Sequence, residues 1–124
     1  MAAVRIENGS LKIQLSWVDR LLGFQGSFEM PLSHVINAYV SSYEDLQLQY
    51  KIEGVNWGMD KSLGIFANPQ GLIFVDVTGD RDCLVVQTRG ERFERIAVQL
   101  AGDQDANAIA HEIMRSIPDS GPVD

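Results

Sequence analysis

This 124-residue chain lacks the features that mark secreted and membrane-spanning proteins. It has one cysteine, Cys83, so no intrachain disulfide can form, and this cysteine lies in an apolar run typical of a small core residue. No apolar run reaches the roughly 18 residues that a membrane-spanning helix needs. The first residues also lack the apolar core of a signal peptide. These absences predict a cytoplasmic protein.

Positive charge is also scarce. The chain has 10 Lys and Arg residues against 17 Asp and Glu residues, which gives a net charge of -7. Such a charge repels polyanions, so nucleic acid is not an expected partner and a membrane surface is disfavoured. Four arginines between positions 81 and 95 are interleaved with three carboxylates, which favours a solvated, salt-bridged hairpin over a lipid-headgroup site. These arginines are Arg81, Arg89, Arg92 and Arg95.

Motifs that carry chemistry are absent as well. There is no paired His or Cys spacing for a metal, no Gly-x-Ser-x-Gly elbow and no glycine-rich phosphate loop. The acidic stretch from Asp76 to Asp82 lacks the late glutamate of a calcium loop. His34 and His111 are interpreted as boundary residues, since a general base at His34 would need a partner that sequence alone does not show. We therefore expect no metal, no cofactor and no catalytic residue, and a protein that is not an enzyme.

The composition is that of an ordinary globular protein, with 45% hydrophobic and 22% charged residues. A chain of this length buries roughly two-thirds of its unfolded surface, which is enough for one core. No linker or repeat divides it. We predict a single domain over residues 1–118, followed by a flexible tail over residues 119–124.

Alternation of apolar and polar residues predicts a series of short antiparallel strands. Asn8-Gly9 suits the positive φ angles of a primed hairpin turn, and Pro69 lies in a turn from 68 to 71. Pro31 ends a strand because proline cannot donate to a sheet ladder. The predicted strands are 4–7, 11–16, 24–30, 33–42, 46–52, 64–67, 72–77, 83–88 and 95–100, with a helical corner at 17–22.

One amphipathic helix is predicted over residues 103–117. Asp103 and Asp105 lie where carboxylates favour the positive end of the helix dipole, Arg115 lies in the last turn, and Pro118 stops the helix. Six apolar residues fall on a single stripe at helical spacing. They are Ala106, Ile109, Ala110, Ile113, Met114 and Ile117.

A sheet of short strands leaves bare edges unless it curls, so a partly open antiparallel barrel of about seven strands, capped by the helix, is the predicted fold. This order resembles a pleckstrin-homology-like domain. The chain is also similar to a family of small bacterial proteins with that fold, through the stretches from Pro31 to Val35, from Gly64 to Phe66 and from Phe74 to Thr78. The resemblance implies a mostly β protein with a binding or scaffolding role, and it brings no catalytic residues.

The segment from Glu53 to Leu63 has no steady period and is predicted to be the longest loop, where function tends to lie. Trp57, Asp60 and Lys61 are its candidate residues for binding a partner, because tryptophan is frequent at interface hot spots. We expect a non-enzymatic domain that acts through protein–protein contacts or self-association. The alternative is a small-ligand carrier or enzyme of a cone-shaped α+β fold, which would show a pocket of about 300 Å³ or more with convergent polar groups.

Overall fold

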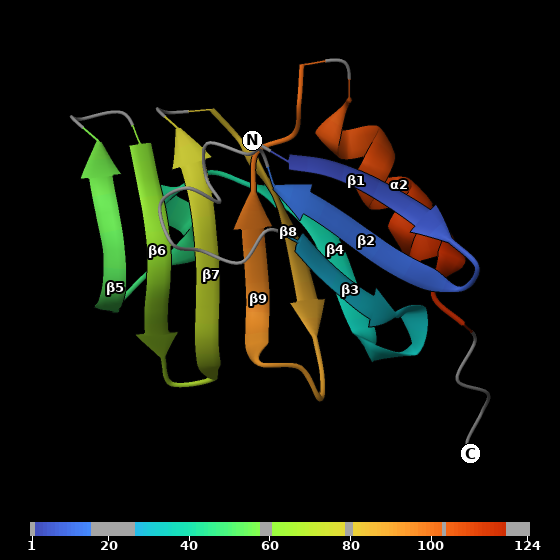
Figure 1. The fold of residues 1–124 in the computed structure, drawn as a ribbon, viewed down its shortest axis with the longest axis horizontal. Coiled ribbons are helices and arrows are strands. Elements are labelled where there is room, and N and C mark those ends of the chain that lie inside the picture. The colour runs from blue at the N-terminus through green and yellow to red at the C-terminus, as the bar shows by residue number, and fades with distance from the viewer. Residues whose placement is uncertain (1, 16–26, 58–60, 79–80, 103, 119–124) are drawn as a thin grey trace.

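A three-stranded sheet, a six-stranded sheet and one C-terminal helix make up the fold (Figure 1). The structure, a computed structural model, describes residues 2–15, 27–57, 61–78, 81–102 and 104–118. The small sheet contains β1 (Ala2–Glu7), β2 (Ser10–Leu15) and β3 (Ser27–Pro31). The large sheet contains β4 (Val35–Ser41), β5 (Tyr50–Trp57), β6 (Lys61–Asn68), β7 (Gly71–Thr78), β8 (Cys83–Thr88) and β9 (Phe93–Val98). The helices are η1 (Leu32–His34), η2 (Glu44–Leu46) and α2 (Ala106–Ser116).

The N-terminal hairpin forms as the sequence predicts. β1 and β2 pair antiparallel up to Glu7 and Ser10, and the turn residues Asn8 and Gly9 have φ angles of 53° and 78°. Both angles are positive, as a type I′ turn requires. β3 then pairs with β2 and ends at Pro31. The predicted helical corner at 17–22 lies outside the described residues, as does the tail at 119–124.

The six-stranded sheet has the order β4-β8-β9-β7-β6-β5. β8 and β9 form the predicted hairpin, but β9 lies between β7 and β8 and runs parallel to β7. The expectation of purely antiparallel pairing is therefore wrong for this pair. β7 and β8 are thus two strand spacings apart, about 10 Å, with β9 between them. Turn residues mark where a strand ends, and they do not show on which side a later strand adds.

Two predictions about the middle of the chain are wrong. The segment from Glu53 to Leu63 is not a loop, because β5 and β6 pair across it with Trp57 opposite Lys61. The alternation from Leu46 to Ile52 is not one strand either. Its first part is η2, which ends at Gln47 with a left-handed φ of 53°, and only residues from Tyr50 onward are in β5. Leu46 and Leu48 alternate because both pack against the same apolar cluster.

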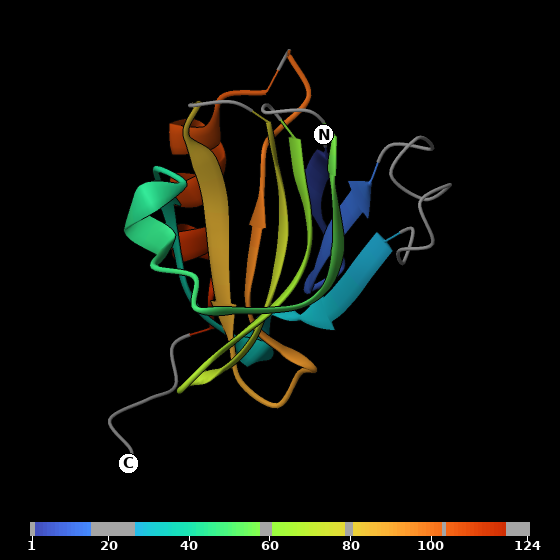
Figure 2. The same cartoon turned by 90° about the vertical axis from the view of Figure 1, so that its left-hand side faces the viewer.

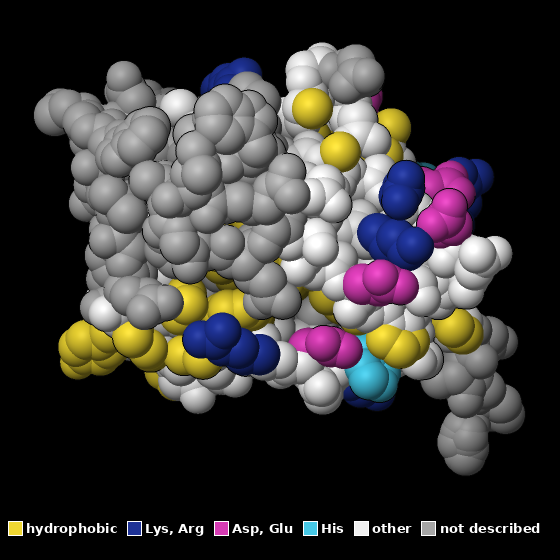
Figure 3. Space-filling view, in the orientation of Figure 1, with side chains coloured by type: hydrophobic (Ala, Val, Ile, Leu, Met, Phe, Trp, Pro, Cys, Tyr) yellow, Lys and Arg dark blue, Asp and Glu magenta, His cyan; other side chains and the backbone are white. Residues whose placement is uncertain are grey.

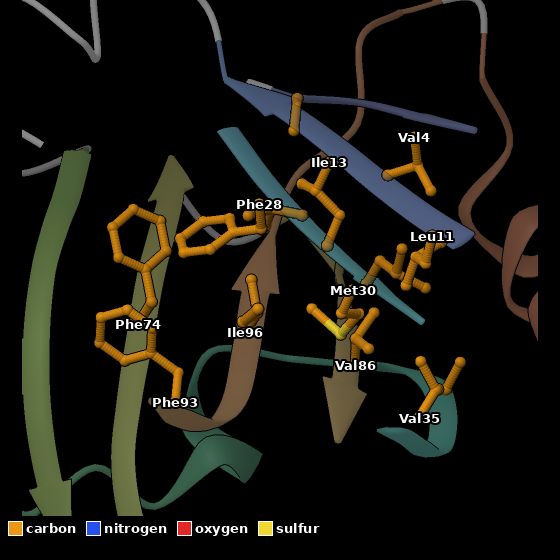
Figure 4. Close-up of a cluster of buried hydrophobic side chains, with 14 of the residues drawn as sticks. Val4, Leu11, Ile13, Phe28, Met30, Val35, Phe74, Val86, Phe93 and Ile96 are labelled. Atoms are coloured by element: carbon orange, nitrogen blue, oxygen red, sulfur yellow. The ribbon is translucent and has the colours of Figure 1, made fainter. Parts of the chain in front are cut away.

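Both faces of the large sheet are covered. Successive residues of a strand point to opposite faces, and Ile73 and Phe74 accordingly belong to two different clusters. On one side Phe28, Phe74 and Phe93 pack edge-to-face with one another, and their ring centroids are 5.0 to 5.8 Å apart (Figure 4). On the other side Leu46 of η2 covers the cluster that contains Ile73. Figure 2 shows the small sheet standing against the large sheet, and buried side chains fill the space between them.

The C-terminal helix confirms most of the predicted stripe. α2 begins at Ala106, after Asp105, whose side chain accepts a hydrogen bond from the Asn107 amide at 3.0 Å. Ala110 and Ile113 are buried in the core cluster that the small sheet also covers, whereas Met114 is 44% exposed. The helix packs against β4 and β8, at the end of the large sheet opposite β5 (Figure 1). Over the described residues the strands do not close into a barrel, and no helix is long and apolar enough to cross a bilayer.

Candidate functional site

The predicted partner-binding residues map to the end of the β5–β6 hairpin. The backbones of Trp57 and Lys61 lie opposite each other in the last pair of the ladder. Asp60 lies outside the described residues. The break in apolar–polar alternation that predicted a loop here therefore marks a β-hairpin. Whether these three residues contact a partner stays a prediction.

The hairpin carries the exposed edge of the large sheet. β5 is the terminal strand, eight residues long, and pairs with β6 alone among the described strands. Tyr50 is 72% exposed and Ile52 is 58% exposed. Ile52 has no opposite residue on β6, because the register shifts between Lys51 and Glu53. This outer side of β5, together with Tyr50 and Ile52, is named the β5 edge.

The edge of β1 is capped, in contrast. The Ala2 amide donates to the Gln99 carbonyl, and the Ala101 amide donates to the Ala2 carbonyl, both at 2.8 Å. The side-chain amide of Gln104 bonds both backbone groups of Val4, at 3.0 and 2.9 Å. A side chain thus takes the place of a neighbouring strand.

The edge of β4 is also protected. α2 packs along this strand. The Ala38 amide, which belongs to β4, contacts the Met114 sulfur at 3.3 Å and the Asn37 side-chain oxygen at 2.9 Å. No such cap is found on β5 within the described part of the chain. An uncapped edge strand is a template for pairing with another strand.

His34 has a partner that the sequence did not reveal. Its Nδ1 lies 2.7 Å from a carboxylate oxygen of Glu91, 57 positions along the chain. The Arg89 amide donates to the His34 carbonyl at 2.8 Å. The pair joins η1 to the β8–β9 turn. Among the described residues no hydroxyl or thiol bonds the His34 ring, so this pair ties two turns together and lacks the nucleophile of a catalytic set.

Two arginines of the cluster, Arg92 and Arg95, contact their neighbours in the sequence. Arg95 lies 3.3 Å from Glu94, and the Arg92 guanidinium lies 4.8 Å from the ring centre of Phe93. Charges of both signs also alternate over the small sheet (Figure 3). The Arg95–Glu94 ion pair fits the salt-bridged interpretation at Arg95, and for the rest of the cluster that interpretation stays a prediction.

Cys83 is a core residue, as predicted. It is fully buried, and its thiol donates to the Ser41 carbonyl at 3.3 Å. Burial, with a smaller effect of the Asp82 carboxylate, raises the pKa of this thiol from 9.0 to about 11. A thiol with such a pKa is a poor nucleophile near neutral pH. Among the described residues, no group of three His, Cys, Asp or Glu side chains could hold a metal ion.

Among the described residues, two open hollows exceed the size expected for a ligand site. One, of about 460 Å³, lies on the outer face of the small sheet and includes Arg5, Lys12 and Glu29. Its cations are offset, since Lys12 lies 2.7 Å and Arg5 lies 4.0 Å from Glu7. A second, of about 330 Å³, lies between η2 and the β6–β7 turn and is lined mainly by amide and charged side chains. It is named the polar hollow.

Comparisons of this chain with protein-family models, with curated proteins and with solved structures find no match. The case for a function therefore rests on the geometry described above.

Proposed function

We propose that this protein is a non-enzymatic binding domain that acts through self-association, by antiparallel pairing of β5 with β5 of a second copy. The observation that carries the proposal is the β5 edge, on which the described residues place no cap, in contrast to the capped edges of β1 and β4. The resemblance to pleckstrin-homology-like domains, which often serve as scaffolds, agrees with a binding role as an analogy of fold.

A second copy is the occupant that fits best. Pairing a strand with itself needs only one surface, because a two-fold interface uses the same patch on both subunits. The whole chain carries a net charge of -7, which opposes contact between copies, but β5 contains one lysine and one glutamate and is neutral. Pairing of β5 with itself therefore adds no net like charge along the contact.

The length of β5 is sufficient for such pairing. The bulge at Ile52 interrupts the strand, and residues 53–57 beyond it still form a regular ladder with β6. Five residues match the common length of a strand. The side chains of Tyr50 and Ile52 are exposed, and pairing with a second sheet would remove part of their apolar surface from contact with water.

Sedimentation velocity over a range of protein concentrations tests the proposal. We expect a reversible monomer–dimer equilibrium for the natural chain. The double variant Tyr50→Lys, Ile52→Lys should remain monomeric with an unchanged melting temperature, because lysine on an edge strand opposes pairing. Trp57→Ala, at the end of β5, should weaken dimerisation with thermal stability nearly unchanged.

Ile36→Lys provides the matched control. Ile36 is an apolar residue on the other edge strand, β4, and is 43% exposed. This variant should dimerise like the natural chain. A natural chain that stays monomeric at every concentration, or a double variant that dimerises as well as the natural chain, would refute self-association through β5.

A further inference from the structure

The polar hollow brings together side chains from segments that are distant in the sequence. Tyr39 comes from β4, Asp45 from η2, Gln70 from the β6–β7 turn and Gln87 from β8. Its volume of about 330 Å³ lies at the lower end of the range for small-molecule sites, about 300–1,000 Å³. The fold thus brings together polar groups that no local sequence motif predicts.

A partly buried ion pair lies beside these groups. Arg95 and Glu94 have side chains only 14% and 18% exposed, and Arg95 also donates to the Leu46 carbonyl at 3.4 Å. The Gln87 amide nitrogen donates to Glu94 at 3.1 Å. This bond fixes the Gln87 side chain, whose amide oxygen accepts no hydrogen bond from the described residues.

One wall of the hollow is held in an uncommon backbone conformation. Gln47 has a φ of 53°, a left-handed conformation that is unfavourable for a residue with a Cβ by about 1 kcal/mol or more. Asn68 holds this segment in place, since its side chain donates to the Gln47 carbonyl at 2.9 Å and accepts from the Gln49 amide at 3.1 Å. Strained residues held in this way cluster at binding sites.

Several amide groups of the hollow lack internal partners. Within the described residues, the side chains of Gln47, Gln49 and Gln70 make no hydrogen bond. Each side-chain amide offers both donors and an acceptor. Such groups suit a ligand that donates and accepts hydrogen bonds at neighbouring positions.

The charges of the hollow exclude other ligand classes. Asp45 repels anions, and the cation Arg95 is already paired with Glu94. An apolar ligand would find little apolar surface, because Leu46 and Pro69 are the aliphatic residues of the described lining. A metal ion would need more carboxylates than the described residues bring together.

We propose that the polar hollow binds a neutral saccharide. Vicinal hydroxyls of a sugar match the paired donors and acceptors of the glutamine amides, and the half-buried ring of Tyr39 gives one aromatic surface for the sugar's C–H groups. A mono- or disaccharide fits the volume.

Titration by NMR tests this inference, with glucose, galactose, N-acetylglucosamine and maltose as probes and inorganic phosphate as the anionic comparison. At least one sugar should produce saturable shifts in the side-chain amide signals of Gln47, Gln49 and Gln70, with a dissociation constant in the millimolar range typical of small polar ligands, about 1 mM. Phosphate should produce none.

The double variant Gln47→Ala, Gln70→Ala should weaken sugar binding at least about tenfold. Both side chains are exposed, so the melting temperature should not fall. Asn107→Ala, an exposed amide on α2, is the matched control and should bind like the natural chain. The inference is overturned if no sugar gives saturable shifts, if only phosphate binds, or if the double variant binds as well as the natural chain.

Discussion

At the scale of single residues, Cys83 shows how burial decides the character of a group. Its thiol is fully enclosed and donates to the Ser41 carbonyl, and its pKa is raised to about 11. In the unfolded chain the thiol ionises near pH 9. The folded state therefore holds its proton more tightly, which stabilises the fold below pH 9 and no longer does so above pH 11.

We accordingly predict that the urea midpoint falls between pH 9 and pH 11, and that part of this fall is absent in Cys83→Ala. Equilibrium unfolding in urea at several pH values gives the midpoint for the natural chain and for Cys83→Ala. Lysines and tyrosines titrate in both chains, so the difference between the two pH profiles reports the thiol. The folded thiol should also react slowly with an aromatic disulfide reagent at pH 8 and rapidly in urea. Rapid reaction without urea, together with identical pH profiles for the two chains, would contradict the burial of this thiol.

The type of a residue can mark it as a candidate for binding, but it does not show which residues lie together in the fold. Trp57 and Lys61 stand out by type, and the structure places their backbones at the end of one hairpin. The His34–Glu91 contact joins residues 57 positions apart. The glutamines of the polar hollow come from the segment after η2, from a turn and from a strand. No local pattern links such residues, because only the folded sheet brings them together.

At the scale of elements, the sequence predicts correctly those strands, turns and helices that a short stretch of neighbouring residues determines. Asn8-Gly9 determines the first hairpin, and the apolar stripe determines α2. The β5–β6 hairpin was not predicted because two features disturb the alternation of apolar and polar residues in its strands. The bulge at Ile52 shifts the phase of alternation, and Gly54 lies directly opposite Gly64, so neither strand shows an apolar side chain there.

The helix allows a direct test of packing. Ile113 is fully buried at the centre of the stripe and joins the main core cluster. We predict that Ile113→Ala lowers the free energy of unfolding by about 2–5 kcal/mol, since the removed atoms leave a cavity. Met114→Ala, one residue on and 44% exposed, should change it by less than about 1 kcal/mol. Chemical denaturation compares the two, and equal effects would show that Ile113 is not the residue through which α2 docks on the core.

At the scale of the whole molecule, the order of the large sheet determines which strands are best protected. β9 pairs with β7 on one side and with β8 on the other, and the sheet is buried on both faces. β5 has one neighbour and the most exposed apolar side chains. Local opening should therefore require the least free energy at β5 and the most at β9.

Amide hydrogen exchange at two protein concentrations tests both the difference in local opening between β5 and β9 and the proposed pairing of two copies. In dilute solution the amides of β5 should exchange fastest among the strands, and those of β9 slowest. At high concentration the pairing of two copies should slow exchange in β5, because its outward amides gain carbonyl partners, while β1 and β4, already capped, should not change. In Tyr50→Lys, Ile52→Lys the rates should be the same at both concentrations. Slower exchange at β1 or β4 instead of β5 would place the contact between copies on a different edge.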